Sequence, residues 1–94
     1  MVPCRVVWSK QVERQLAQIQ HYLRDKFMAW ALAVERVGII EVRKLSGYHD
    51  EPLKGKRAGQ RSLRLNKAYR AIYVEREGGK IRIIDVIEVS KHDY

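Results

Sequence analysis

The stretch that decides the fold is residues 61–89, RSLRLNKAYRAIYVEREGGKIRIIDVIEV. Residues 61–66 alternate between leucines on one side and polar side chains on the other, which predicts a half-buried strand. A second strand is predicted over residues 69–76, and the Gly78-Gly79 pair that follows is typical of a β-hairpin turn. Residues 80–89 place apolar side chains on both faces, which predicts a central strand. The stretch therefore predicts three consecutive strands.

Two amphipathic helices are predicted before these strands. Ser9 is a residue type that caps helix N-termini, and apolar residues then recur at helical spacing on one face: Val12, Leu16, Ile19 and Leu23. A break is expected near residues 25–27. A second apolar stripe follows over residues 30–45, with Gly38 inside it and Gly47 placed to end the helix.

A short β-branched and aromatic segment, residues 5–8, precedes the helices and predicts the first strand. The order β-α-α-β-β-β defines an α+β fold, with a helical hairpin packed on one face of a mainly antiparallel four-stranded sheet. A chain of 94 residues is expected to form one domain over residues 1–94. The larger aromatic side chains are expected in its core: Trp8, Tyr22, Trp30 and Tyr73.

The composition restricts the partners. Lysine and arginine number 19 against 11 aspartates and glutamates, a formal net charge of +8, which predicts a polyanionic partner. Nucleic acid is the commonest such partner, and an anionic membrane surface or an acidic protein tail are the alternatives. Cys4 is the only cysteine and no zinc-site spacing is present, so neither a metal nor a small-molecule cofactor is expected. We recognise no signal peptide and no membrane-spanning run, and expect a cytoplasmic protein without a membrane partner.

Basic and aromatic residues are expected around the sheet face that the helices leave uncovered. Residues 48–59 lack periodicity and predict a basic loop. The candidate residues come from this loop, the strands and the C-terminal tail: Lys54, Lys56, Arg57, Arg61 or Arg64, Arg70, His92 and Tyr94. Strict alternation places Arg70 on the side of Ile72 unless a bulge or strong twist turns it. A structural ion pair is the alternative role for Arg70, with three candidate partners: Glu75, Asp85 and Glu88.

This set of side chains suits binding and cleavage of RNA. Cations bind phosphate, and an arginine fork can stabilise the charge that grows in a transition state. His92 could give a proton to a leaving 5′-oxygen, because histidine titrates near neutral pH. A tyrosine such as Tyr69 or Tyr94 can hold a base. The 2′-hydroxyl of the RNA can serve as the nucleophile.

Residues 52–73, PLKGKRAGQRSLRLNKAYRAIY, and residues 86–94, VIEVSKHDY, resemble the RelE/HigB superfamily of bacterial type II toxins. The similar features are a proline-leucine-lysine-glycine loop, a strand of alternating basic residues, an aromatic-arginine strand and a catalytic tail. The order of the predicted elements is also that of the family, so the resemblance spans essentially the whole chain.

The resemblance implies a ribosome-dependent mRNA endoribonuclease, an mRNA interferase. Such a toxin acts in the ribosomal A site by 2′-hydroxyl attack, inhibits translation and is neutralised by a cognate antitoxin. By position, Arg70 matches the catalytic arginine and Arg64 a phosphate-facing basic residue. His92 matches the general acid and Tyr94 the aromatic residue of the tail. Lys54 belongs to the shared loop, where it is expected to grip RNA.

The resemblance leaves the general base and the target open. His49 is similar to a histidine that precedes proline-leucine in HigB-like members, although Asp50 and Glu51 intervene here. Glu51, Lys54 and His49 are all candidates for the base. ParE-type toxins share the scaffold but poison DNA gyrase without nuclease activity, and they are the alternative. The His92-to-Tyr94 tail favours the nuclease.

Overall fold

The computed structural model describes residues 2–91, and His92 and Tyr94 lie outside this range. The elements are β1 (Cys4–Trp8), α1 (Lys10–Gln18), α2 (His21–Val37), α3 (Ile39–Arg43), the 3-10 helix η1 (Ser46–Tyr48), β2 (Glu51–Pro52), the 3-10 helix η2 (Gly55–Arg57), β3 (Arg61–Arg64), β4 (Tyr69–Gly78) and β5 (Ile81–Lys91). The six predicted elements occur in the predicted order, and α3, β2 and the two 3-10 helices are additional. The α+β fold, with helices packed on a mostly antiparallel sheet, is therefore confirmed.

The sheet has the strand order β1-β5-β4-β3-β2. β1 runs parallel to β5, and the remaining neighbours are antiparallel. β5 lies between two strands, as its apolar character on both faces predicted. The predicted count of four strands is wrong by one: residues 51–52, expected within a loop, pair with residues 61–62 as a short edge strand. Two residues carry no periodicity, so the sequence pattern could not reveal this strand.

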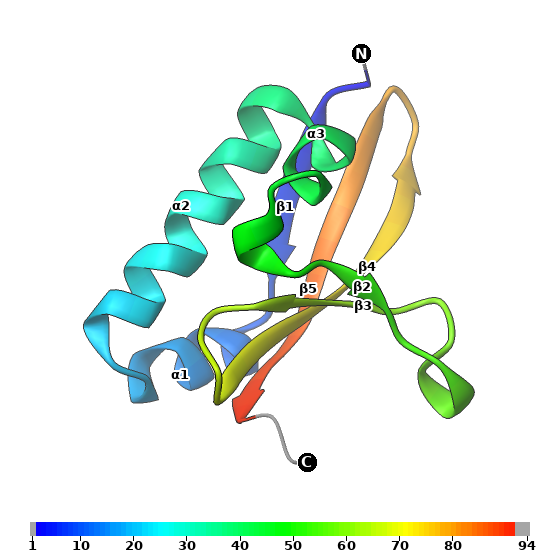
Figure 1. Cartoon of the computed structure of the whole chain (residues 1–94). Coiled ribbons are helices and arrows are strands. Elements are labelled where there is room, and N and C mark those ends of the chain that lie inside the picture. Colours follow the sequence, from blue (N-terminus) through cyan, green and yellow to red (C-terminus); the bar gives the residue numbers. More distant parts are fainter. Residues whose placement is uncertain (1, 92–94) are drawn as a thin grey trace.

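The helices cover one face of the sheet (Figure 1). An aromatic stack joins the layers: Phe27 lies 5.7 Å from Trp30, and Trp30 lies 5.5 Å from Tyr73, between ring centroids. All three side chains are fully buried. The expectation of a buried Tyr22 is wrong, because this residue of α2 is 56% exposed. Within residues 2–91, no helix has the length and apolar character needed to cross a membrane.

The first helix ends earlier than predicted. Ser9 does cap α1, since its hydroxyl accepts from the backbone N–H of Val12 at 3.3 Å. The chain then becomes extended at Ile19, whereas residues 25–27 lie inside α2. Leu23, predicted on the first helix, is buried on the second. Val12 and Leu16 of α1 and Leu23 of α2 are all buried in one core. Their helical spacing therefore continues from one helix into the next and conceals the break between them.

Gly38, not Gly47, ends the long helix. Its φ of 89° and ψ of 156° are open mainly to glycine, and α2 stops there before α3 begins. Gly47 lies within η1 and has no positive φ. The left-handed residue after η1 is His49, with φ 44°.

Candidate active site

The sheet face opposite the helices carries a row of polar residues, which we call the open face. Leu63, Ala71 and Val89 pair across the sheet and belong to the hydrophobic core, so their strand neighbours point the other way. The register then places these residues on the open face: Glu51, Ser62, Arg64, Arg70, Ile72, Glu88 and Ser90.

Arg64 and Arg70 are directly opposite each other on β3 and β4. Their Cβ atoms are therefore about 5 Å apart, and like charges so placed destabilise a sheet. Arg64 is exposed and Arg70 is half-buried. The Nε of Arg70 is buried and has no hydrogen-bond partner among the residues described. A buried unpaired donor costs about 1–3 kcal/mol. Two guanidinium groups side by side also concentrate positive charge, so this arginine pair is suited to bind an anion.

The alternative role of Arg70 in a structural ion pair finds no partner. Its three candidate carboxylates bind other arginines: Glu75 binds Arg43 at 2.7 Å, Asp85 binds Arg76 at 3.0 Å, and Glu88 binds Arg57 at 2.7 Å. Within residues 2–91, Arg70 itself makes no ion pair. Its guanidinium is therefore not occupied by a carboxylate of the described chain.

Glu88 ties the basic loop to the open face. Its carboxylate accepts hydrogen bonds from Arg57 at 2.7 Å and from the Ser90 hydroxyl at 2.6 Å. Burial alone would raise the pKa of Glu88, but these two bonds and the charges of Arg57 and Arg70 lower it overall. Glu88 therefore stays charged and holds η2 over the sheet. It was expected only as a possible partner of Arg70.

A small hollow lies beside the arginine pair. Its lining comes from the segment around β2, from β3, from the β3–β4 turn and from the start of β4: His49, Glu51, Ser62, Arg64, Asn66, Lys67, Tyr69 and Arg70. Two of the three candidate general bases, His49 and Glu51, are therefore next to both arginines. Lys54, the third, is exposed and does not line the hollow, and Lys56 is likewise exposed in the loop.

The β3–β4 turn is held by Asn66. Its side-chain oxygen accepts from the backbone N–H groups of Ala68 at 2.8 Å and Tyr69 at 2.7 Å. Its amide nitrogen donates to the Tyr22 hydroxyl at 2.9 Å, which links the turn to α2. Tyr69 is only half-buried and packs partly against the core. The rim of the hollow is therefore fixed by an Asx-type turn.

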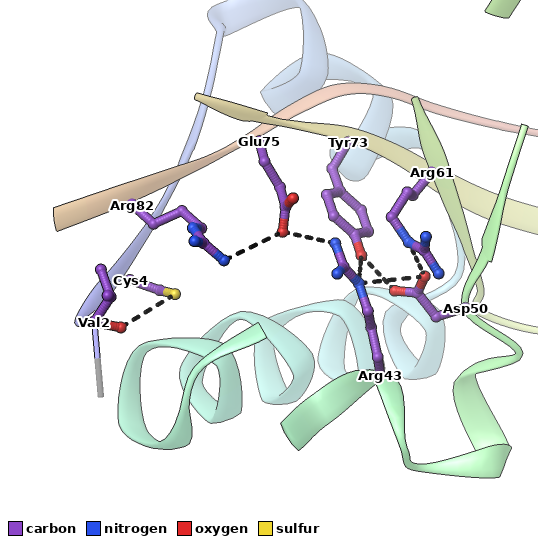
Figure 2. A network of polar contacts seen from close by, with 8 residues as sticks. All are labelled: Val2, Cys4, Arg43, Asp50, Arg61, Tyr73, Glu75 and Arg82. Carbon is purple, nitrogen blue, oxygen red and sulfur yellow. Dashed lines mark hydrogen bonds and ion pairs between the residues drawn. The ribbon is translucent and has the colours of Figure 1, made fainter. Parts of the chain in front are cut away.

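Arg61 lies on the helix-bearing face, away from the arginine pair. It pairs with Tyr73 in the sheet and donates from Nε to Asp50 at 2.7 Å. The Tyr73 hydroxyl donates to the same carboxylate at 2.5 Å, and Arg43 donates to that hydroxyl at 3.2 Å (Figure 2). Of Arg61 and Arg64, the two alternatives on the strand predicted over residues 61–66, the open face thus holds Arg64.

Burial, followed by the hydrogen bond to Asp50, raises the pKa of Tyr73 above its usual value. Burial alone would lower the pKa of Arg43, but its bond to Tyr73 and the neighbouring negative charges raise it overall. No role was predicted for Asp50 or Arg43. Asp50 is one of two adjacent acidic residues in the loop of residues 48–59, and the sequence alone does not distinguish it from a surface charge.

Two of the residues assigned to the chemistry, His92 and Tyr94, are outside the described range. The described part of β5 ends at Lys91, opposite Tyr69 on β4. Its preceding residue, Ser90, is opposite Arg70. The last strand therefore leads along the open face as far as the arginine pair.

Neither a protein-family model nor a curated protein sequence matches the chain. Solved structures do. A YoeB/ParE toxin from Agrobacterium tumefaciens superposes with a TM-score of 0.73 at 21% identity, over 95% of this chain and 99% of that one. The toxin–antitoxin complex RelBE2 from Mycobacterium tuberculosis gives 0.66 at 21% identity, over 97% and 100%. YafQ from Escherichia coli gives 0.69 at 17% identity, over 92% and 90%. The chain therefore shares its fold with these proteins over their full length.

Proposed function

We propose that this chain, which has the RelE-like fold, is the toxin of a type II toxin–antitoxin system and cuts mRNA on the ribosome. The observation that carries the proposal is the pair of arginines on the open face, one with a buried Nε that has no hydrogen-bond partner within residues 2–91. A cross-strand pair of like charges does not stabilise a sheet. It is explained by an anionic ligand, and the phosphodiester of RNA is the anion that fits a toxin of this fold.

The arginine pair would bind the scissile phosphate. Arg70 offers a half-buried guanidinium and Arg64 an exposed one, so the phosphate can be held from two sides. Charge on the phosphoryl oxygens grows as the 2′-hydroxyl attacks, and arginines already in place stabilise it. The remaining basic residues of the loop, Lys54, Lys56 and Arg57, would contact the RNA backbone beyond the cleavage point.

The hollow supplies the proton acceptor. We assign Glu51 as general base, because a carboxylate on the open face beside Arg64 can take the proton of the 2′-hydroxyl. His49, on the rim of the same hollow, is the second candidate. The 2′-oxygen bonds to phosphorus, the bond from phosphorus to the 5′-oxygen breaks, and His92 protonates that oxygen. Tyr94 or Tyr69 would position a base. The products are a 2′,3′-cyclic phosphate and a 5′-hydroxyl.

An antitoxin is the proposed protein partner. The structure of RelBE2 is that of a toxin–antitoxin complex, which suggests the same kind of partner for this chain. Exposed apolar residues gather on and beside α2: Val2, Met28, Leu32, Val37 and Ile40. An amphipathic, acidic antitoxin segment would match either these residues or the basic open face. Co-purification with the product of a neighbouring reading frame tests this proposal.

The deciding experiment is induction of the chain in a bacterial host, followed by mapping of mRNA 5′ ends. New 5′ ends within translated codons are expected. They should disappear in Arg70→Ala and His92→Gln variants that are expressed to the same level. Arg36→Ala removes an exposed arginine of α2 and serves as the control for the loss of one charge. It should cut as the unmodified chain does.

Two outcomes would contradict the nuclease. If Arg70→Ala and His92→Gln remain toxic at equal expression, the assignment of the site is wrong. If growth stops while mRNA stays intact and an SOS response appears, the chain acts on DNA gyrase as ParE-type toxins do.

A further inference from the structure

Asp50 is a buried carboxylate that lies between two residues of the candidate site. Its side chain is only 1% exposed, and it lies on the helix-bearing side of the sheet (Figure 2). Its immediate neighbours, His49 and Glu51, both line the hollow on the other side. Asp50 therefore points to the helix-bearing side at this edge of the sheet, whereas His49 and Glu51 lie on the side that holds the arginine pair.

Three side chains, from two strands and one helix, hold the Asp50 carboxylate. Arg61 of β3 donates at 2.7 Å, the Tyr73 hydroxyl of β4 donates at 2.5 Å, and Arg43 of α3 lies 3.9 Å away. Both oxygens are used: Oδ1 faces the two arginines and Oδ2 the tyrosine. A carboxylate with this many partners has one orientation, and its backbone is fixed with it.

The segment it fixes is short, and its other contacts are backbone hydrogen bonds, such as those from His49 N–H to Ser46 and from Leu53 N–H to Gln60, and the packing of Tyr48 against the core. β2 is two residues long and pairs with β3 through Glu51 and Pro52. His49 has a left-handed φ of 44°, a conformation that is uncommon for residues other than glycine. Both His49 and Glu51 are exposed. Burial of their own side chains therefore does not place them, whereas burial of Asp50 between them does.

We infer that Asp50 is a positioning residue: anchored by Arg61, Tyr73 and Arg43, it holds His49 and Glu51 against the Arg64–Arg70 pair. The inference rests on the proposed function, for which these two residues are the candidate proton acceptors. The Asp50 network would thus place the two proton acceptors. The arginines proposed to bind phosphate are held separately, by their own strands β3 and β4. Removing the network should therefore slow the chemical step and leave RNA binding intact.

The test is Asp50→Asn, which keeps the shape of the side chain and removes its charge. Cleavage is measured in single turnovers on ribosomes programmed with a defined mRNA. A displacement of about 1 Å in a reacting group can cost on the order of 10²-fold in rate. We expect the maximal rate to fall by about 10- to 100-fold with the half-saturating concentration unchanged. An unchanged rate, or a rise in half-saturation alone, would overturn the inference.

A double-mutant cycle separates positioning from general instability. In a Glu51→Gln, His49→Gln background neither proton acceptor that Asp50 is inferred to place remains, so Asp50→Asn should have no further effect on the residual rate. A loss by the same factor in both backgrounds would show a structural role only. Glu75→Gln is the matched control: it removes the other carboxylate bound to Arg43 without touching residues 49–51, and should cut normally. If Asp50→Asn does not fold, Arg61→Met removes one partner of the same carboxylate and should show a smaller loss in the same sense.

Amide hydrogen exchange provides a readout that needs no RNA. Asp50→Asn should raise exchange at residues 46–53 and leave β4 and β5 protected. Absence of cleavage by the unmodified chain would contradict the proposed function, and exchange would still decide whether Asp50 places this segment. Unchanged exchange at residues 46–53 would overturn the inference by itself.

Discussion

At the scale of single residues, Arg70 is placed at a cost to stability. Its buried Nε has no hydrogen-bond partner in the described part of the chain, and its cross-strand neighbour on β3 is another arginine. Arg70→Met keeps the apolar stem and removes both penalties. We expect the free energy of unfolding to stay the same or to rise by about 1 kcal/mol, while mRNA cleavage falls by about 10²–10³-fold. Urea unfolding and cleavage assays check the two effects, and lower stability would indicate that Arg70 is structural.

Tyr73 makes a second prediction, on alkaline stability. Burial raises its pKa above the usual 10, so the folded chain keeps a proton that the unfolded chain loses. Its contribution is therefore fully present below pH 10 and is lost as the pH rises from 10 toward the folded pKa. Between pH 9 and 11, Tyr73→Phe should lose less stability than the unmodified chain. Tyr48→Phe is the control, because the tyrosine that bonds to Asp50 is Tyr73 and not Tyr48. This variant should lose as much stability over the same pH range as the unmodified chain.

The residue patterns predicted the open face better than the groups that support it. Alternation predicted that Arg64 points away from the face of Leu63 and Leu65 and that Arg70 shares a face with Ile72. Both hold because the two-residue period of a strand is fixed by backbone geometry. Asp50 and Glu88 could not be assigned from the sequence. Their partners are distant in the chain, and no periodicity links residue 50 to residue 73 or residue 57 to residue 88.

At the scale of elements, two glycines test why the second helix ends where it does. Gly38 has φ 89°, and a side chain there would be strained. Gly38→Ala should lower the free energy of unfolding by about 1–3 kcal/mol. Gly47 has no positive φ, and a Cβ there would meet nothing within 4 Å, so Gly47→Ala should have little effect. Equal effects of the two substitutions in urea unfolding would contradict this account.

The η2 loop depends on one ion pair with the sheet. Arg57 reaches Glu88 at 2.7 Å, and the pKa of Glu88 is lowered by its bonds and by neighbouring positive charge. The stability that this ion pair contributes is therefore present above the usual pKa of a glutamate, and it is lost as the pH falls and Glu88 is protonated. Glu88→Gln should speed tryptic cleavage after residues 54–57 several-fold at neutral pH. Asp85→Gln, which loses an ion pair elsewhere in β5, should not speed it.

At the scale of the whole molecule, the charge of +8 predicts how binding depends on salt. Each phosphate that a cation neutralises contributes about 0.7 to the slope of log affinity against log salt for single strands. Arg64→Ala or Arg70→Ala should each reduce that slope by about 0.7, measured with single-stranded RNA. Arg36→Ala, which removes the same charge from α2, should not change it. Equal slopes for all three variants would mean that the open face does not bind the backbone.

The parallel pairing of β1 with β5 joins residues 4–8 to residues 82–86, so that strands near the two ends of the described chain are neighbours. During synthesis the first strand has no neighbour in the sheet until the last strand has been made. β5 also supplies Glu88 and Ser90, so the open face is incomplete for the same interval. Contacts this distant in sequence form late and slow folding. A nascent chain therefore completes the open face only after β5 has been synthesised and has paired with β4.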